Sequence, residues 1–155
     1  MLFRSGFHNI GNRLAVHDFD GRLSQLGFAA SDFLLMPSLF EPCGLPQMQA
    51  PIYGSLAVAH NTGGLHDTVE PLDAAASKGN GFRFDTYDSN GLFWAMNQAM
   101  EFWHLPPETR EREIARVMRE SAERFNHQEC ARRYIELYER MLHRPLVRSF
   151  AEGGE

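Results

Sequence analysis

The feature that most limits the fold of this chain is a pair of continuous apolar runs separated by a short helical pattern. The runs are "DFLLMPS" (32–38) and "SLAVAH" (55–60). Such runs are typical of strands buried on both faces of a parallel sheet. The stretch between them, "LPQMQAPIYG" (45–54), predicts a short helix that opens with Pro46 and ends at Gly54. The order strand, helix, strand predicts parallel strands joined by a crossover.

The rest of the chain extends this alternation. We expect strands over 13–19 and 81–85, a helix over 21–31, a short helical segment over 61–69, a loop over 70–80, and long helices over 89–104, 106–125 and 126–144. The expected fold class is therefore α/β: a partial Rossmann-like parallel sheet with flanking helices, equivalent to half of a doubly wound domain. We expect one partial domain over 1–145, with its core over 13–104 and closing helices over 106–144, and a flexible tail over 146–155.

Apolar side chains on the long helices predict how those helices pack. The first long helix carries Leu92, Met96, Ala99 and Trp103 on one stripe, and we expect its four large aromatic residues, Phe93, Trp94, Phe102 and Trp103, to pack on the sheet. A sugar-stacking surface is the alternative for these rings. The last helix carries a seam of Tyr134, Leu137, Tyr138 and Met141, for which core packing and a partner surface both stay open.

Composition excludes several classes of function. A formal charge of −5 and a pI near 5.8 argue against a nucleic-acid surface. The two cysteines are too few for a disulfide framework, so we expect a reducing, cytoplasmic location. No apolar run approaches the length of a membrane span. The seven histidines show no metal-ligand spacing, so we expect no metal and no cofactor.

Two loops follow the strands with unusual chemistry. "SLFEPCGL" leaves the first apolar run and "HNTGGL" leaves the second, and ligands of open parallel sheets bind at these carboxyl ends. Glu41 supplies an acceptor for sugar or ribose hydroxyls, Thr62 supplies a hydroxyl, and the glycines allow close approach of the backbone. Each loop also leads into a helix start, which favours an anion. The pattern predicts a site for a phosphorylated sugar or nucleotide.

A simpler interpretation of both loops stays open. A glycine pair after a strand is commonly just a turn, and the alternative role of Glu41 is to cap the helix behind it. Neither loop matches a Walker or dinucleotide-binding pattern. His60 and His66 flank the glycine loop, where we expect solvated histidines rather than ligands.

The stretch from Asp32 to Val69 resembles the glycogen and starch synthases. The likeness rests on "PSLFEPCGLPQ" and "TGGLHDTV" with "YG" between them, and it continues more weakly from Phe19 to about Tyr138. The resemblance implies a GT-B glycosyltransferase that transfers glucose, with retention, from ADP-glucose to the non-reducing end of an α-1,4-glucan. It implies that the active site lies in a cleft between two domains.

The resemblance also implies roles for matched positions. Glu41 would be the catalytic position that binds donor hydroxyls. The other implied positions bind substrate: Cys43, Gly44 and Leu45 at the glucosyl and phosphate groups, Thr62, Gly63 and Gly64 at the diphosphate or sugar, and Phe19 against the adenine.

This chain departs from the family in ways that bear on activity. The family neutralises the donor diphosphate with an Arg and a Lys that have no counterpart here, and Lys78 is the only Lys or Arg between Arg22 and Arg83. Gln49 stands where many related transferases carry a second acid. The N-terminal GT-B portion, to which the family's last helix crosses, is not recognisable in the sequence.

We therefore expect the chain alone to be inactive and to have that portion as a partner. The alternatives are a non-catalytic nucleotide-sugar-binding or interaction module, from a split gene or a relic, and another GT-B nucleotide-sugar transferase.

Overall fold

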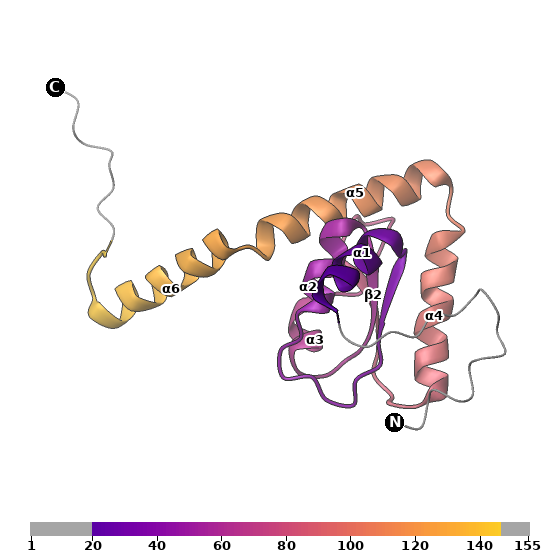
Figure 1. Ribbon diagram of the computed structural model, residues 1–155, viewed down its shortest axis with the longest axis horizontal. Coiled ribbons are helices and arrows are strands. Elements are labelled where there is room, and N and C mark those ends of the chain that lie inside the picture. Colours follow the sequence, from indigo (N-terminus) through magenta and orange to yellow (C-terminus); the bar gives the residue numbers. More distant parts are fainter. Residues whose placement is uncertain (1–19, 147–155) are drawn as a thin grey trace.

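A computed structural model describes residues 20–146 of the chain (Figure 1). Its elements follow in the order α1 (Gly21–Ala30), β1 (Phe33–Met36), α2 (Pro46–Gln49), the 3-10 helix η2 (Ala50–Tyr53), β2 (Leu56–His60), α3 (Gly63–Thr68), β3 (Gly81–Phe84), α4 (Ser89–Trp103), α5 (Pro107–Arg124) and α6 (His127–Leu142). The predicted α/β class is confirmed. The strand predicted over 13–19 and most of the tail predicted over 146–155 lie outside the described residues.

The three described strands form a parallel sheet in the order β1-β2-β3. Phe33 pairs with Leu56, and Ala57 pairs with Gly81. Every residue of β2 is buried, as its apolar run predicts. The prediction that β1 is buried on both faces is wrong, because Leu35 is 49% exposed. The reason is position: within residues 20–146, β1 lies at the edge of the sheet and β2 at its centre.

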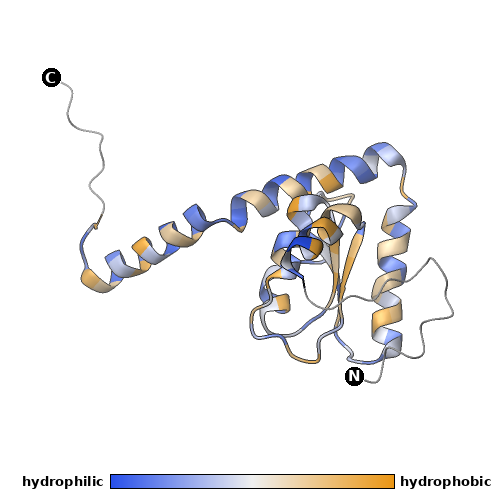
Figure 2. Cartoon of the chain, in the orientation of Figure 1, coloured by the Kyte–Doolittle hydropathy of each residue, from blue (hydrophilic) through white to orange (hydrophobic). Residues whose placement is uncertain are grey.

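Helices cover the two faces of the sheet. One cluster joins Leu56 and Val58 of β2 to the buried residues of α4 and to Val117 of α5. The other joins Ala57 and Ala59, which alternate with them along the strand, to the α3 segment. Figure 2 shows the strands as the most hydrophobic part of the chain, between helices that carry both kinds of residue. The period of two along β2 thus explains the layered core.

The face of α4 that packs on the sheet differs from the predicted stripe. Its buried residues are Ala95, Ala99 and Phe102. The prediction that all four aromatic rings pack on the sheet is wrong, because Phe93 is 63% and Trp94 is 56% exposed. Two alanines on the buried face let the helix approach the strands closely, which turns the preceding large side chains outward. Trp103 does pack inward, with its ring centroid 5.9 Å from that of Phe33.

A buried carboxylate attaches α5 to the loop before β3. Glu113 is 1% exposed and accepts hydrogen bonds from the Ser77 hydroxyl at 2.9 Å and from Arg116 Nε at 2.9 Å. Arg116 also donates to the Gly79 carbonyl at 2.8 Å. Burial alone raises the pKa of the Glu113 carboxyl, but the hydrogen bonds from Arg116, Ser77 and Arg112 outweigh it, so the pKa lies below its ordinary value of 4.5.

Helix α6 extends away from the rest of the molecule (Figure 1). Asn126 caps its start by accepting a hydrogen bond from the Glu129 N–H at 2.8 Å. None of its residues is buried, so of the two interpretations of its seam the core one is wrong for the described chain. Among residues 20–146, no helix is both long and apolar enough to cross a membrane.

Candidate functional site

The two loops named from the sequence lie against each other at the carboxyl ends of β1 and β2. The Gly64 N–H donates a hydrogen bond to the Glu41 carbonyl at 2.8 Å. A Cβ on Gly63 would lie 2.0 Å from that same carbonyl oxygen, and a Cβ on Gly64 would lie 2.0 Å from the Cys43 carbonyl oxygen. Both glycines are therefore required by contact between the loops. The two loops are neighbours, as predicted. The glycines were expected to let a ligand approach the backbone closely, but part of that space is taken by the opposite loop.

Gln47 holds the first loop from behind and was missed by the sequence analysis. Its side chain is fully buried, and its Nε2 donates to the carbonyls of Cys43 at 2.8 Å and Gly44 at 3.0 Å. Nε2 also lies 3.2 Å from the Thr68 hydroxyl of α3. Gly44 has φ of +73°, and a Cβ there would meet the Gln47 amide at 2.4 Å. A buried glutamine one turn after the loop thus fixes its backbone to α3.

The candidate residues differ in how far they are open to a ligand. The side chains of Cys43 and Leu45 are exposed, those of Glu41 and Thr62 are half-buried, and Gly64 is buried. Phe19, the residue expected against the adenine, lies outside the described residues. The structure therefore brings together all the other residues predicted for the site, on two touching loops.

Histidines beside the glycine loop have structural partners. His60 is 8% exposed, its Nδ1 lies 2.8 Å from the Ser38 carbonyl oxygen, and its ring packs against Phe84 and Tyr87. The expectation of a solvated loop histidine is wrong for His60, because it ends the buried strand β2. His66 is exposed and bonds to Asn61. Within the described residues, no group of His, Cys, Asp and Glu could hold a metal ion.

The helices behind the loops are too short to attract an anion strongly. Helix α2 has 4 residues and α3 has 6, so few peptide dipoles add up along either axis. The Gly64 N–H is already used by Glu41. Within the described residues, the Thr62 hydroxyl and the Gly63 amide are the groups at the start of α3 with no hydrogen bond. Binding at this end would rest on these individual groups.

Two arginines lie at the opposite end of α3, which corrects the expectation that only Lys78 would be near the motifs. Arg83 Nη1 donates to the carbonyls of His66 at 3.0 Å and Val69 at 3.1 Å. Arg124 donates to the Asp67 carbonyl and pairs with Glu70 at 3.0 Å. These cations stabilise the carboxyl end of α3. The sequence does not predict that Arg124 lies near α3, because this residue comes from the end of α5.

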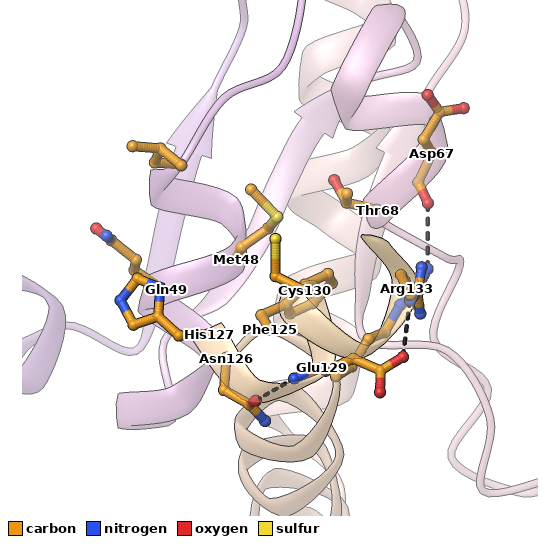
Figure 3. Close-up of a pocket in the computed structure, with 12 residues that line it drawn as sticks. Met48, Gln49, Asp67, Thr68, Phe125, Asn126, His127, Glu129, Cys130 and Arg133 are labelled. Atoms are coloured by element: carbon orange, nitrogen blue, oxygen red, sulfur yellow. Dashed lines mark hydrogen bonds and ion pairs between the residues drawn. The ribbon is translucent and has the colours of Figure 1, made fainter. Parts of the chain in front are cut away.

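A groove of about 710 Å³ separates α2 and α3 from the junction of α5 and α6 (Figure 3). Met48 and Cys130 lie on facing walls, and Leu45 connects the groove to the first loop. Glu129 on the α6 side receives hydrogen bonds from Arg132 and Arg133, which lower its pKa to about 2. The first loop is thus continuous with a surface that reaches α6.

Relatives of this chain are glycogen synthases. It is 41% identical over 128 residues to glycogen synthase 1 of Geobacter metallireducens, and 40% identical over 126 residues to the glycogen synthase of Streptococcus sanguinis. These matches cover 83% and 80% of this chain but 25% of each relative. The chain therefore spans about a quarter of the length of the curated relatives it matches. No family model matches the chain.

Solved structures agree with this relationship. The catalytic domain of starch synthase IV from Arabidopsis thaliana, bound to ADP and acarbose, superposes with a TM-score of 0.69 at 36% identity, over 83% of this chain and 26% of that one. Sucrose-phosphate synthase from Thermosynechococcus elongatus superposes with a TM-score of 0.64 at 24% identity, over 87% of this chain and 32% of that one. The second likeness shows the fold alone.

Proposed function

We propose that this chain, which matches the C-terminal part of glycogen and starch synthases, carries the donor-binding loops of such an enzyme. Together with the rest of a GT-B enzyme, it transfers glucose from ADP-glucose to the non-reducing end of an α-1,4-glucan, with retention at the anomeric carbon. The observation that carries the proposal is the contact between the Glu41 and Gly64 loops at the ends of two parallel strands. The match to glycogen synthase 1 spans both loops and supports the proposal.

We assign most of the loop residues the roles that the family resemblance implies. The Glu41 carboxylate binds hydroxyls of the donor, and the Thr62 hydroxyl and Gly63 amide contact its sugar or diphosphate. Cys43, Gly44 and Leu45 line the glucosyl and phosphate groups. We assign Gly64 a positioning role, because its N–H holds the Glu41 carbonyl at 2.8 Å. The related starch synthase structure is bound to ADP, which supports a nucleotide as the ligand.

A partner polypeptide is part of the proposal. Within residues 20–146, the arginines nearest α3, Arg83 and Arg124, hold its carbonyls, so these two arginines are not free to give a diphosphate the electrostatic support that its departure requires. The apolar seam of α6 is exposed, with Tyr134 at 57% and Met141 at 67%. We infer that the N-terminal GT-B portion covers this seam and supplies the missing cations. The free cysteines fit a cytoplasmic location.

Two alternatives make different predictions. A non-catalytic module would bind a second polypeptide through α6 without activity in the complex, and the exposed seam favours it. Another GT-B transferase would prefer a different nucleotide, so competition between ADP and UDP separates it from a glycogen synthase.

The deciding measurement is a calorimetric titration of the folded chain with ADP, ADP-glucose and UDP. We expect saturable binding of the ADP ligands that is weakened in Glu41→Ala and unchanged in Glu111→Ala, a control carboxylate exposed on α5. Normal donor binding by Glu41→Ala would refute the role given to that carboxylate. Glucan elongation by the purified chain alone would refute the requirement for a partner.

A further inference from the structure

A second hollow lies at the outer edge of β3, and none of its described lining residues belongs to the two loops. Its volume is about 220 Å³, and α4 and the segment before β3 form its walls. Pockets for drug-sized ligands begin at roughly 300 Å³. The hollow therefore suits one ring of a larger molecule, with the remainder in solvent. The residues that matter for its chemistry are Arg83, Asp85, Trp94 and Gln98.

Trp94 supplies an apolar wall that the core does not use. Its side chain is 56% exposed although it lines the hollow. Gln98 follows it by one helical turn, so both side chains lie on the same face of α4. An exposed indole face beside an amide offers an apolar contact and hydrogen bonds within one ring's width. A pyranose ring has the matching chemistry, with apolar C–H groups on its faces and hydroxyls around its rim.

Two polar side chains that line the hollow, Asp85 and Arg83, are held in place by hydrogen bonds. Asp85 accepts a hydrogen bond from Asn61 through one carboxylate oxygen, and the second oxygen can accept from a hydroxyl. Arg83 is fixed by the two carbonyls of α3 and has further N–H groups to donate. Fixed polar groups favour binding, because little side-chain entropy is lost.

The backbone of β3 adds a donor and an acceptor. The N–H and C=O of Gly81 point to the outer edge, where they bond to Glu70 and Leu72. Strand backbone groups alternate in direction, so those of Arg83 turn to the same edge. A bridge between Pro71 and Gly81 occupies this edge at Gly81, and within residues 20–146 no strand pairs with it at Arg83.

We propose that this hollow is a surface site for a glucose ring of an α-glucan. Trp94 stacks on the face of the ring, and Asp85, Gln98 and the Arg83 edge bind its hydroxyls. The choice of glucan rests on the proposed function, whereas the stacking geometry does not. Since Asp85 bonds to Asn61 beside the Thr62 loop, a glucan held here stays near the donor loops.

Native electrophoresis of the full chain through gels that contain glycogen tests the site, with dissociation constants for maltoheptaose measured by calorimetry. We expect Trp94→Ala to weaken binding at least tenfold, about 1.4 kcal/mol. Phe93→Ala is the matched control, because Phe93 is the neighbouring exposed ring and does not line the hollow. Glu41→Ala should bind maltoheptaose normally. Circular dichroism checks that each variant is folded.

Each outcome decides the proposal. Loss of glucan binding in Trp94→Ala alone supports the hollow, even if ADP-glucose does not bind and the proposed function fails. Equal losses in Trp94→Ala and Phe93→Ala would refute specific stacking. Loss in Glu41→Ala with retention in Trp94→Ala would place the glucan at the loops and overturn the proposal, as would a folded chain that binds no glucan.

Discussion

Replacing Glu113 tests the attachment of α5 most directly. Glu113→Ala removes the carboxylate that accepts hydrogen bonds from Arg116 and Ser77 in a site that is 1% exposed. Breaking a buried ion pair by removing one partner costs roughly 3–5 kcal/mol. Arg116 keeps its bonds to Gly79 and Glu120, so we expect a loss near the lower end, about 3 kcal/mol.

Urea unfolding of the wild type and variants measures this loss. Glu120→Ala is the matched control, because Glu120 pairs with the same Arg116 but its side chain is 57% exposed. An exposed ion pair contributes less than about 1 kcal/mol. Similar losses for the two variants would refute the argument that burial makes Glu113 decisive.

The pH dependence gives an independent check. The pKa of Glu113 is lower in the folded chain than its ordinary value of 4.5. At pH values between the two pKa values, the unfolded chain therefore binds more protons than the folded chain. The stability that Glu113 contributes is therefore complete above pH 4.5 and is lost as the pH falls through the lower, folded pKa. The difference in unfolding free energy between wild type and Glu113→Gln should shrink below pH 4.5. A difference that is independent of pH would contradict the lowered pKa.

Two further predictions concern the loops and α6. Gly64→Ala forces a Cβ against the Cys43 carbonyl and should lower the free energy of unfolding by about 2 kcal/mol. In the control Gly27→Ala, the new Cβ meets open space in α1, so the free energy of unfolding should stay unchanged or rise by about 0.5 kcal/mol. Equal effects of the two substitutions in urea unfolding would show that the loops can separate at little cost. In a carboxyl NMR titration, Glu129 should titrate near pH 2, and Arg132→Ala should raise that pKa toward its ordinary value; an unchanged pKa would mean that Arg132 does not hold the carboxylate.

The sequence predicted the elements well where local pattern and tertiary position agree. β2 is a continuous apolar run and lies at the centre of the described sheet, so its burial follows from the pattern. The run of β1 is as apolar, but within residues 20–146 the strand lies at the edge of the sheet, and edge position cannot be read from the run itself. On α4 the buried face holds Ala95, Ala99 and Phe102, and the apolar pattern alone does not distinguish this face from the one that carries Phe93 and Trp94.

The proximity of the two loops was predictable from the sequence, whereas the contacts that their glycines make were not. The motifs place Glu41, Thr62 and the glycines together, and the contacts agree. The glycines were expected to leave room for a ligand, but Gly63 and Gly64 pack against the backbone of the other loop. The support from Gln47 has a weak signal, an amide one turn after a glycine, which is common in helices that have no such role. The exposure of the Trp94 ring was not predictable either, because it depends on which face of α4 packs on the sheet.

The hydrogen bond between the Gly64 N–H and the Glu41 carbonyl joins the two loops into one structural unit. With each glycine fitted against the backbone of the opposite loop, neither segment can lengthen, shorten or change its path alone. A chimera that grafts only one loop from a distant relative would bring mismatched surfaces together, and the pair must be exchanged as a unit. A change in what these loops bind would then come from replacing side chains on an unchanged loop backbone.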